Sequence, residues 1–295
     1  MTASFREYSH QPGFTQDFHA VREFLLRINQ PMVTTPNFLW GRWEWAFSLP
    51  YLDTKSLNRI GIWEEHGQIV GLITYEDSLG TAYLMTDPEY GFLKPEMLAY
   101  GINHLSCDGE FKIPINDNDR ALQHAAISFG LHPTQGKQAT AAIELNPDLQ
   151  IPVPVGYQRF SLADHCDIRE YHQCLYRGFN HLGEPPDSES ELKARTISIS
   201  GPHVKRDLNI VVADEKGHYV SYCGMWYEPG TNYALVEPVC TVPEHRKKGC
   251  GKAAVLEAVR RCGLLGAKIA FVGSGQQFYF QIGFFPHTTD TVWSI

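Results

Sequence analysis

A short basic loop, Arg246-Lys-Lys-Gly-Cys-Gly251, separates two segments with different hydrophobic patterns. An apolar segment with strand character, residues 233–242, precedes it, and a helical pattern, residues 252–262, follows it. The first N–H groups of a helix have no intrahelical acceptor, and the helix dipole makes that end positive, so such a loop binds anions, phosphate in particular. The residues expected to hold this anion, by side chain or main chain, are Arg246, Lys247, Lys248, Gly249, Cys250, Gly251 and Lys252.

The spacing within this loop excludes two common phosphate loops. A Walker loop needs Ser or Thr after its Lys, but Lys252 is followed by Ala253. A dinucleotide-binding fingerprint needs a third Gly where Ala254 stands. The pattern R-x-x-G-x-G, which directly follows Val242-Pro-Glu-His245, resembles motif A of the GNAT superfamily of acyl-CoA N-acyltransferases. This resemblance implies that the loop holds the pyrophosphate of coenzyme A.

Composition and charge narrow the class of protein. The chain has 295 residues, a net charge of −8 and a pI of about 5.9, which argues against nucleic acid as a partner. Its seven cysteines show no C-x-x-C spacing, and the Cys and His residues between 165 and 181 lack metal-ligand geometry, so no metal is expected. The first residues contain no apolar leader, and no apolar run is long enough to cross a membrane. We therefore expect a cytoplasmic protein with no membrane partner.

The order of the expected elements occurs twice along the chain. Each half begins with an amphipathic helix, continues with strands joined by tight turns, and then reaches a further helix. In the first half the expected elements are a helix at 18–28, strands at 60–63, 69–75 and 81–85, and a helix at 94–104. In the second half they are a helix at 167–177, strands at 208–213, 218–226 and 233–242, and a helix at 252–262.

Short sequence echoes support a duplication. Asp87-Pro-Glu-Tyr90 corresponds to Val242-Pro-Glu-His245, and Ser128-Phe-Gly-Leu-His-Pro133 corresponds to Gln281-Ile-Gly-Phe-Phe-Pro286. A Pro-rich segment, residues 146–154, favours an extended connection between the copies. We therefore predict an α/β (α+β) protein with two tandem GNAT-like domains, residues 1–150 and 151–295. By resemblance, each has a mixed, splayed central sheet flanked by helices.

The first copy lacks the features of the anion loop. Its corresponding segment, Gly91-Phe-Leu-Lys-Pro95, has one Gly, little positive charge and a Pro suited to the first turn of a helix. This degenerate copy is expected to act as a scaffold, as a wall of the acceptor cleft, or as the surface of a possible homodimer. The aromatic-rich segment 38–45 could cover such an interface, although core packing explains it as well.

Near the end of the second copy, Phe278-Tyr-Phe-Gln-Ile-Gly-Phe284 resembles motif B of the same family. In that family a Tyr four residues before the Gly protonates the departing coenzyme A thiolate, and Tyr279 occupies this place. A phenol with a pKa near 10 suits this role. The first copy has Ala126 at the matching position, so the Tyr is present where motif A is intact and missing where it is degenerate.

The strand before the loop contains the remaining candidates. Pro238 cannot donate a ladder hydrogen bond, which predicts a bulge or an unpaired stretch. The resemblance implies that main-chain groups of Cys240, Thr241 and Val242 contact the cofactor and the oxyanion. Glu237 is the one carboxylate in this apolar strand and is the candidate base; the alternative is an exposed Glu paired with a basic neighbour.

The function implied is transfer of an acyl group, acetyl being expected, from acetyl-CoA to the primary amine of a small molecule. The amine would attack directly in a ternary complex, with Glu237 as base and Tyr279 as acid. Two alternatives remain at this point. One is a non-catalytic protein that binds or senses acyl-CoA, and the other is a transferase that uses a different acyl donor.

Overall fold

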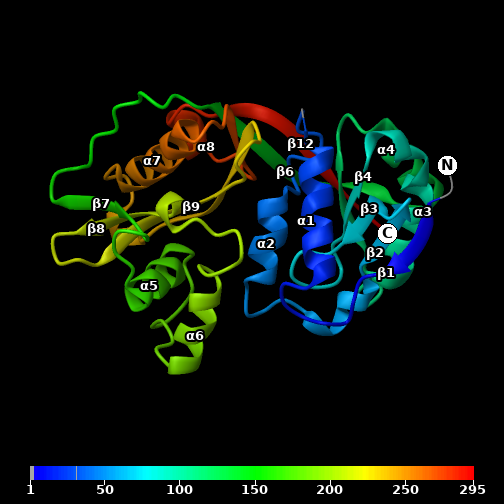
Figure 1. Ribbon diagram of the computed structural model, residues 1–295, viewed down its shortest axis with the longest axis horizontal. Coiled ribbons are helices and arrows are strands. Elements are labelled where there is room, and N and C mark those ends of the chain that lie inside the picture. Colours follow the sequence, from blue (N-terminus) through cyan, green and yellow to red (C-terminus); the bar gives the residue numbers. More distant parts are fainter. Residues whose placement is uncertain (1–2, 31) are drawn as a thin grey trace. The chain divides into compact units, whose positions relative to one another are not determined.

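The computed structural model describes residues 3–30 and 32–295. The chain forms two compact units, and each combines strands with helices (Figure 1). Unit 1 contains the chain up to Thr140 together with residues 273–275 and Pro286–Ile295. Unit 2 contains Ala141–Val272 and Gln276–Phe285. These limits differ from the division at 150/151 predicted from sequence, because residues 141–150 belong to unit 2, whereas residues 273–275 and the last ten residues of the chain belong to unit 1.

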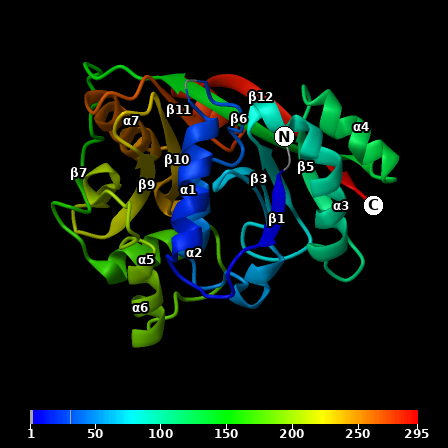
Figure 2. The ribbon, with the colours of Figure 1, turned by 45° about the vertical axis from the view of Figure 1, so that its right-hand side comes forward.

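In unit 1, helices cover both faces of a four-stranded antiparallel sheet with the order β1-β2-β3-β4. Helices α1 and α2 lie on one face, and α3 lies on the other with α4 beside it (Figures 1 and 2). The strands are β1 (Ser4–Glu7), β2 (Gly61–Glu65), β3 (Gln68–Thr74) and β4 (Tyr83–Thr86). The helices are α1 (Gln16–Ile28), α2 (Trp40–Phe47), α3 (Lys94–His104) and α4 (Arg120–Ser128).

The helices of unit 1 form because their apolar residues recur at helical spacing and their ends are capped. The Thr15 hydroxyl accepts a hydrogen bond from the Phe18 N–H and caps α1. Trp40 and Trp43 of α2 are each only 1% exposed, so the aromatic-rich segment forms part of the core of its own unit. Burying side chains of this size stabilises the unit by about 2–3 kcal/mol each.

Two strands are shared between the halves of the chain. The end of β6 (His132–Glu144) belongs to unit 2, and nearly all of β12 (Phe285–Ser294) belongs to unit 1. β12 pairs antiparallel with β5 (Lys112–Asn116) and borders the first part of β6, all within unit 1. The last residues of β6, Ala141–Glu144, pair with β11 (Ile269–Val272) in unit 2. A strand from each half therefore completes a sheet of the other.

In unit 2, the end of β6 begins a sheet with the order β6-β11-β10-β9-β8-β7. Only β10 and β11 pair in parallel; the other pairs described here are antiparallel. The further strands are β7 (Tyr157–Ser161), β8 (Ile210–Asp214), β9 (Tyr219–Tyr227) and β10 (Tyr233–Thr241). The helices are α5 (Ile168–Gly178), α6 (Glu189–Ile197), α7 (Cys250–Leu264) and α8 (Gln277–Gln281).

Helices α5 and α7 lie on opposite faces of the sheet of unit 2 (Figure 1). The helices predicted at 18–28, 94–104, 167–177 and 252–262 are confirmed as α1, α3, α5 and α7. The connecting segment, residues 146–154, contains neither helix nor strand, as its prolines predict. In the described part of the chain, no helix has the length and apolar character needed to span a membrane.

Candidate functional site

Strand β10 leaves its neighbour β11 part-way along its length. The two strands pair only at Tyr233–Leu235, opposite Ile269–Phe271. Beyond this point, Glu237 and Pro238 are inserted as a bulge in the pairing with β9, and the peptide bond between them is cis. The bulge predicted from Pro238 is thereby confirmed. Its consequence is an edge of β10 that opens away from β11 directly before the basic loop.

Because of the bulge, the even-numbered residues of β10 lie on one face of the sheet before it and on the other face after it. Before the bulge, Val236 packs in the core beneath α7, whereas after it Cys240 and Val242 pack in the core beneath α5. Gly224 on β9 lies opposite the bulge, where an added Cβ would approach the Glu237 carbonyl oxygen to 2.7 Å. A residue without a side chain is therefore required at this point of closest approach.

The basic loop leads into α7 through two residues with left-handed backbone, Lys247 (φ 59°) and Gly249 (φ 87°). Gly249 is the N-cap of α7 and provides no side-chain cap to the first helical N–H groups. Residues 246–249 and Lys252 are exposed, and the first turn of α7 contains no acidic residue. The loop thus presents an uncapped helix N-terminus together with exposed lysines, an arrangement that favours an anion.

The second glycine of the loop has a packing role. A Cβ on Gly251 would lie 3.0 Å from the Thr241 hydroxyl oxygen and 3.3 Å from the Phe278 ring. Gly251 therefore allows the start of α7 to approach the end of β10 and the helix α8. Cys250, between the two glycines, is fully buried and packs in the core, as its position in the motif suggests.

The Arg246 side chain binds other parts of unit 2. Its Nε donates to the Thr241 carbonyl at 2.9 Å, and its Nη2 donates to the Gly178 carbonyl at 2.9 Å and the Asn180 amide oxygen at 2.8 Å. Arg246 thus joins the end of β10 to the end of α5. From the sequence, this guanidinium was predicted to bind an anion. In the structure, the three acceptors described here are protein groups.

The three predicted main-chain ligands on β10 have different surroundings. The Val242 N–H donates to the Val220 carbonyl at 2.9 Å, so it cannot reach a cofactor without breaking this bond. The Cys240 carbonyl accepts from the Ser221 hydroxyl at 2.9 Å, and its thiol is buried. Thr241 accepts from Arg246 through its carbonyl, as described above. Successive N–H groups of a strand point to opposite edges, and the Val242 N–H points to β9, so the Thr241 N–H points to the open edge of β10.

The two predicted catalytic residues lie close enough to interact electrostatically. Tyr279 on α8 is 6% exposed and packs between the rings of Phe278 and Phe284. Burial raises the pKa of Tyr279 above its usual value, and negative charge on nearby groups, Glu237 among them, adds to the rise. Glu237 itself is half-buried in the bulge, and its carbonyl accepts a hydrogen bond from the Trp226 indole at 3.0 Å.

A groove of about 580 Å³ lies beside the start of α7. Gly249, Lys252 and Leu256 of α7 line one side, and the connecting segment lines another. The end of α8 and the end of β6 complete the lining. The groove shares Gly249 and Lys252 with the basic loop, so an anion at the loop would lie at one end of it. Sequence patterns did not predict this groove, because it depends on the path of the connecting segment.

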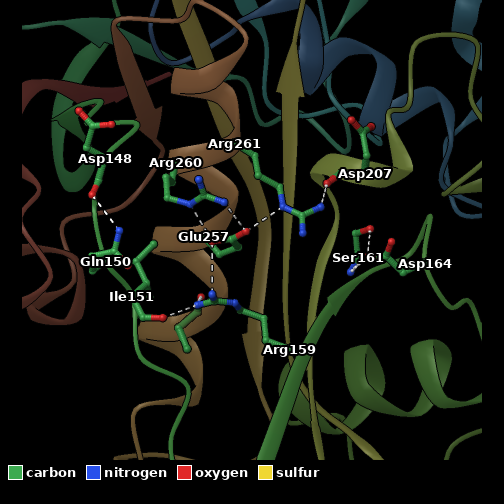
Figure 3. Close-up of polar contacts among 11 residues, drawn as sticks. Asp148, Gln150, Ile151, Arg159, Ser161, Asp164, Asp207, Glu257, Arg260 and Arg261 are labelled. Carbon is green, nitrogen blue, oxygen red and sulfur yellow. Dashed lines mark hydrogen bonds and ion pairs between the residues drawn. The ribbon is translucent and has the colours of Figure 1, made fainter.

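An arginine cluster around Glu257 holds the connecting segment against α7 (Figure 3). Glu257 is 4% exposed and binds Arg260 and Arg261 at 2.9 Å and Arg159 of β7 at 3.4 Å. Arg159 also donates to the Ile151 carbonyl at 3.0 Å. Burial acts to raise the pKa of Glu257, but the hydrogen bonds and charges of the arginines outweigh it and lower the pKa to about 2.

The sequence of residues 167–284 matches the model of the acetyltransferase (GNAT) family. Residues 167–284 therefore form a GNAT domain. The match covers the open strand β10, the basic loop, α7 and Tyr279, which are the parts that make up the candidate site. The fold of this GNAT domain is that of an acyltransferase. No curated protein matches the chain by sequence.

Solved structures extend the likeness to the whole chain. A GCN5-related N-acetyltransferase from Sphaerobacter thermophilus is 14% identical, with 99% of this chain and 95% of that chain covered and a TM-score of 0.59. A tandem GNAT protein from the clavulanic acid biosynthesis pathway is 14% identical, with 100% and 98% covered and a TM-score of 0.63. At these identities the likeness shows the fold alone. The chain therefore has the fold of a tandem GNAT protein.

Proposed function

We propose that the chain is an N-acyltransferase that transfers acetyl from acetyl-CoA to the primary amine of a small molecule. The observation that carries this proposal is the separation of β10 from β11 after Leu235, beside an uncapped helix N-terminus. An open strand edge offers hydrogen bonds to an extended amide chain, and the helix N-terminus offers a site for the pyrophosphate. Lys247, Lys248 and Lys252 supply the cations near it.

The proposed reaction is direct attack by the amine on the thioester carbonyl carbon. Glu237, or a water molecule bound to it, takes a proton from the ammonium group so that the nitrogen can attack. The Thr241 N–H is the group we propose to stabilise the oxyanion. When the C–S bond breaks, the thiolate takes the Tyr279 proton, and the second proton lost by the amine restores the phenol. A phenol is protonated at neutral pH, and the rise in the pKa of Tyr279 leaves it so.

The proposal is tested first by titration calorimetry with acetyl-CoA. Gly249→Asp places a carboxylate and a side chain at φ 87° in the loop, and we expect it to abolish binding. Gly217→Asp is the matched control, because Gly217 has φ 88° in an exposed turn of the same unit with open space around it. We expect the control to bind acetyl-CoA as the unmodified protein does. Failure of the unmodified protein to bind would refute the proposal.

Catalysis is tested by following the thiol released from acetyl-CoA with a panel of primary amines. Release above background with at least one amine supports acetyl transfer. Background rates with every amine, together with binding of acetyl-CoA, would instead favour the non-catalytic alternative. Faster release from longer acyl-CoA donors would favour a different acyl group.

A further inference from the structure

A pair of hydroxyl groups lies between β9 and β10, beside the peptide group that joins Cys240 to Thr241. Ser221 of β9 is fully buried, and its hydroxyl donates to the Cys240 carbonyl at 2.9 Å. The same hydroxyl lies 2.9 Å from the Thr241 hydroxyl, because Ser221 and Thr241 are opposite each other in the ladder. Ser221 is the one aliphatic hydroxyl of β9, so this contact is particular to the end of β10.

The direction of these hydrogen bonds follows from the number of protons available. A hydroxyl group has one proton to donate. Because Ser221 gives its proton to the Cys240 carbonyl, it can only accept a hydrogen bond from the Thr241 hydroxyl. The chain of bonds therefore runs from the Thr241 hydroxyl through the Ser221 hydroxyl to the Cys240 carbonyl. In a buried site, the bonds of such a chain strengthen one another by about 10–30% each.

The Cys240 carbonyl and the Thr241 N–H are the two ends of one peptide group, and they point in opposite directions. The carbonyl points to β9, where it accepts from Ser221, and the N–H points to the open edge of β10. A hydrogen bond to the carbonyl oxygen draws electrons from the peptide nitrogen, so the N–H becomes a stronger donor. At the same edge, Arg246 binds the Thr241 carbonyl at 2.9 Å and places positive charge beside it.

We infer that Ser221 is a positioning residue for the proposed transfer, because its hydroxyl orients and polarises the peptide group whose N–H binds the thioester oxygen. The inference rests on the proposed function, in which the Thr241 N–H stabilises the oxyanion. Ser221 lies on the β9 side of β10, away from the open edge, so it acts through this peptide and does not touch the acyl group. Its effect increases as negative charge develops on the oxygen, and it therefore favours the transition state.

The role of Ser221 is tested by infrared difference spectroscopy of bound acetyl-CoA with an isotopic label at the thioester carbonyl. A hydrogen bond to this carbonyl lowers its stretching frequency, so the frequency reports the strength of the Thr241 N–H as a donor. We expect a higher frequency on Ser221→Ala than on the unmodified protein. Thr241→Val, which replaces the hydroxyl by a methyl group and keeps the N–H, should give a smaller rise, since only the first bond of the chain is lost.

Ser161→Ala is the matched control for the loss of a buried hydroxyl. Ser161 of β7 is 1% exposed and donates to the Asp164 carboxylate at 2.7 Å, and two strands separate β7 from β10. Its replacement should leave the carbonyl frequency unchanged, whatever its effect on the Tm. If instead Ser161→Ala shifts the frequency as far as Ser221→Ala does, the shift reports general loosening of the unit and the inference is overturned.

Steady-state kinetics with a reactive amine provides the second measurement. We expect Ser221→Ala to lower kcat about tenfold and to leave the KM for acetyl-CoA unchanged, as the loss of one hydrogen bond that acts mainly in the transition state requires. A raised KM with an unchanged kcat would contradict the inference. Ser161→Ala should keep both values.

The outcomes separate this inference from the proposed function. Equal carbonyl frequencies on Ser221→Ala and on the unmodified protein, with acetyl-CoA bound to both, would overturn the inference and leave the proposed function intact. If Ser221→Ala does not fold, Thr241→Val provides the same test, and an unchanged frequency on it overturns the inference. If the unmodified protein binds no acetyl-CoA, the proposed function fails and the inference fails with it.

Discussion

Replacing Glu257 by Gln tests the arginine cluster that surrounds this residue. Glu257 is 4% exposed and is the carboxylate that Arg159, Arg260 and Arg261 share. A glutamine of the same size keeps the packing of the side chain but provides no charge. The three guanidinium groups would then repel one another across a buried site, so we expect Glu257→Gln to destabilise unit 2.

The size of this effect follows from the pKa of Glu257. The structure lowers that pKa from 4.5 to about 2, and this difference corresponds to about 3 kcal/mol. The arginine side chains are 17–27% exposed, so screening by water and salt reduces the effect to about 2 kcal/mol. For a unit of this size, such a loss lowers the Tm by about 4–8 °C.

The contribution of Glu257 to stability should decrease as the pH falls. Because folding lowers the pKa of Glu257, its contribution to stability is complete above pH 4.5 and is lost as the pH falls toward 2. The difference in Tm between the unmodified protein and Glu257→Gln should therefore be constant from pH 7 to pH 5. It should become smaller at pH 3, where the native carboxyl begins to take up protons.

Differential scanning calorimetry at pH 7, 5 and 3 measures these differences. Glu215→Gln, which changes an exposed Glu in the β8–β9 turn, is the matched control and should leave the Tm unchanged. A Glu257→Gln variant as stable as the unmodified protein at pH 7 would refute the assignment of stability to this cluster. A loss that persists undiminished at pH 3 would show that the effect comes from packing and not from charge.

Three further substitutions test other parts of the structure. Tyr279→Phe removes only a hydroxyl, so we expect kcat to fall about a hundredfold with acetyl-CoA affinity unchanged, measured by steady-state kinetics and calorimetry; an unaltered kcat would remove Tyr279 as the acid. Gly224→Ala places a Cβ 2.7 Å from the Glu237 carbonyl oxygen, so thermal unfolding should show a loss of about 2 kcal/mol, and a normal Tm would contradict the tight approach at the bulge. Burial raises the pKa of Asp290 in β12 from 3.8 to about 6, so its contribution to stability is lost as the pH rises through this range. Asp290→Asn should therefore raise the Tm at pH 8 but not at pH 3, and equal effects at both values would contradict the charge argument.

The sequence predicted those elements whose signals are local. The amphipathic pattern of α1 and its Thr15 cap, and the similar pattern and Asp167 cap of α5, lie within a few residues of the helix they specify. Strand β12 was missed because its partner β5 lies about 170 residues away in the chain, as the pairing of Asp290 with Asn116 shows. Strand periodicity identifies a face but not a distant partner, so the exchange of strands had no sequence signal.

The same distinction applies to the candidate site. The bulge at Pro238 was predictable because proline lacks an N–H, and the exposed lysines of the loop follow from local charge. The partners of Arg246 were not predictable, because they depend on where the end of α5 lies. The role of Arg159 was missed for the same reason, since its two main-chain acceptors come from the connecting segment and from α7.

The exchange of β6 and β12 makes each half of the chain depend on the other for a complete sheet. Without residues Ala141–Glu144, the outer edge of β11 would have no strand partner and would expose unpaired N–H and C=O groups, a template for aggregation. Synthesis is affected too, because unit 1 remains without β12 until residues 286–295 leave the ribosome. Either half produced alone would therefore have an incomplete sheet.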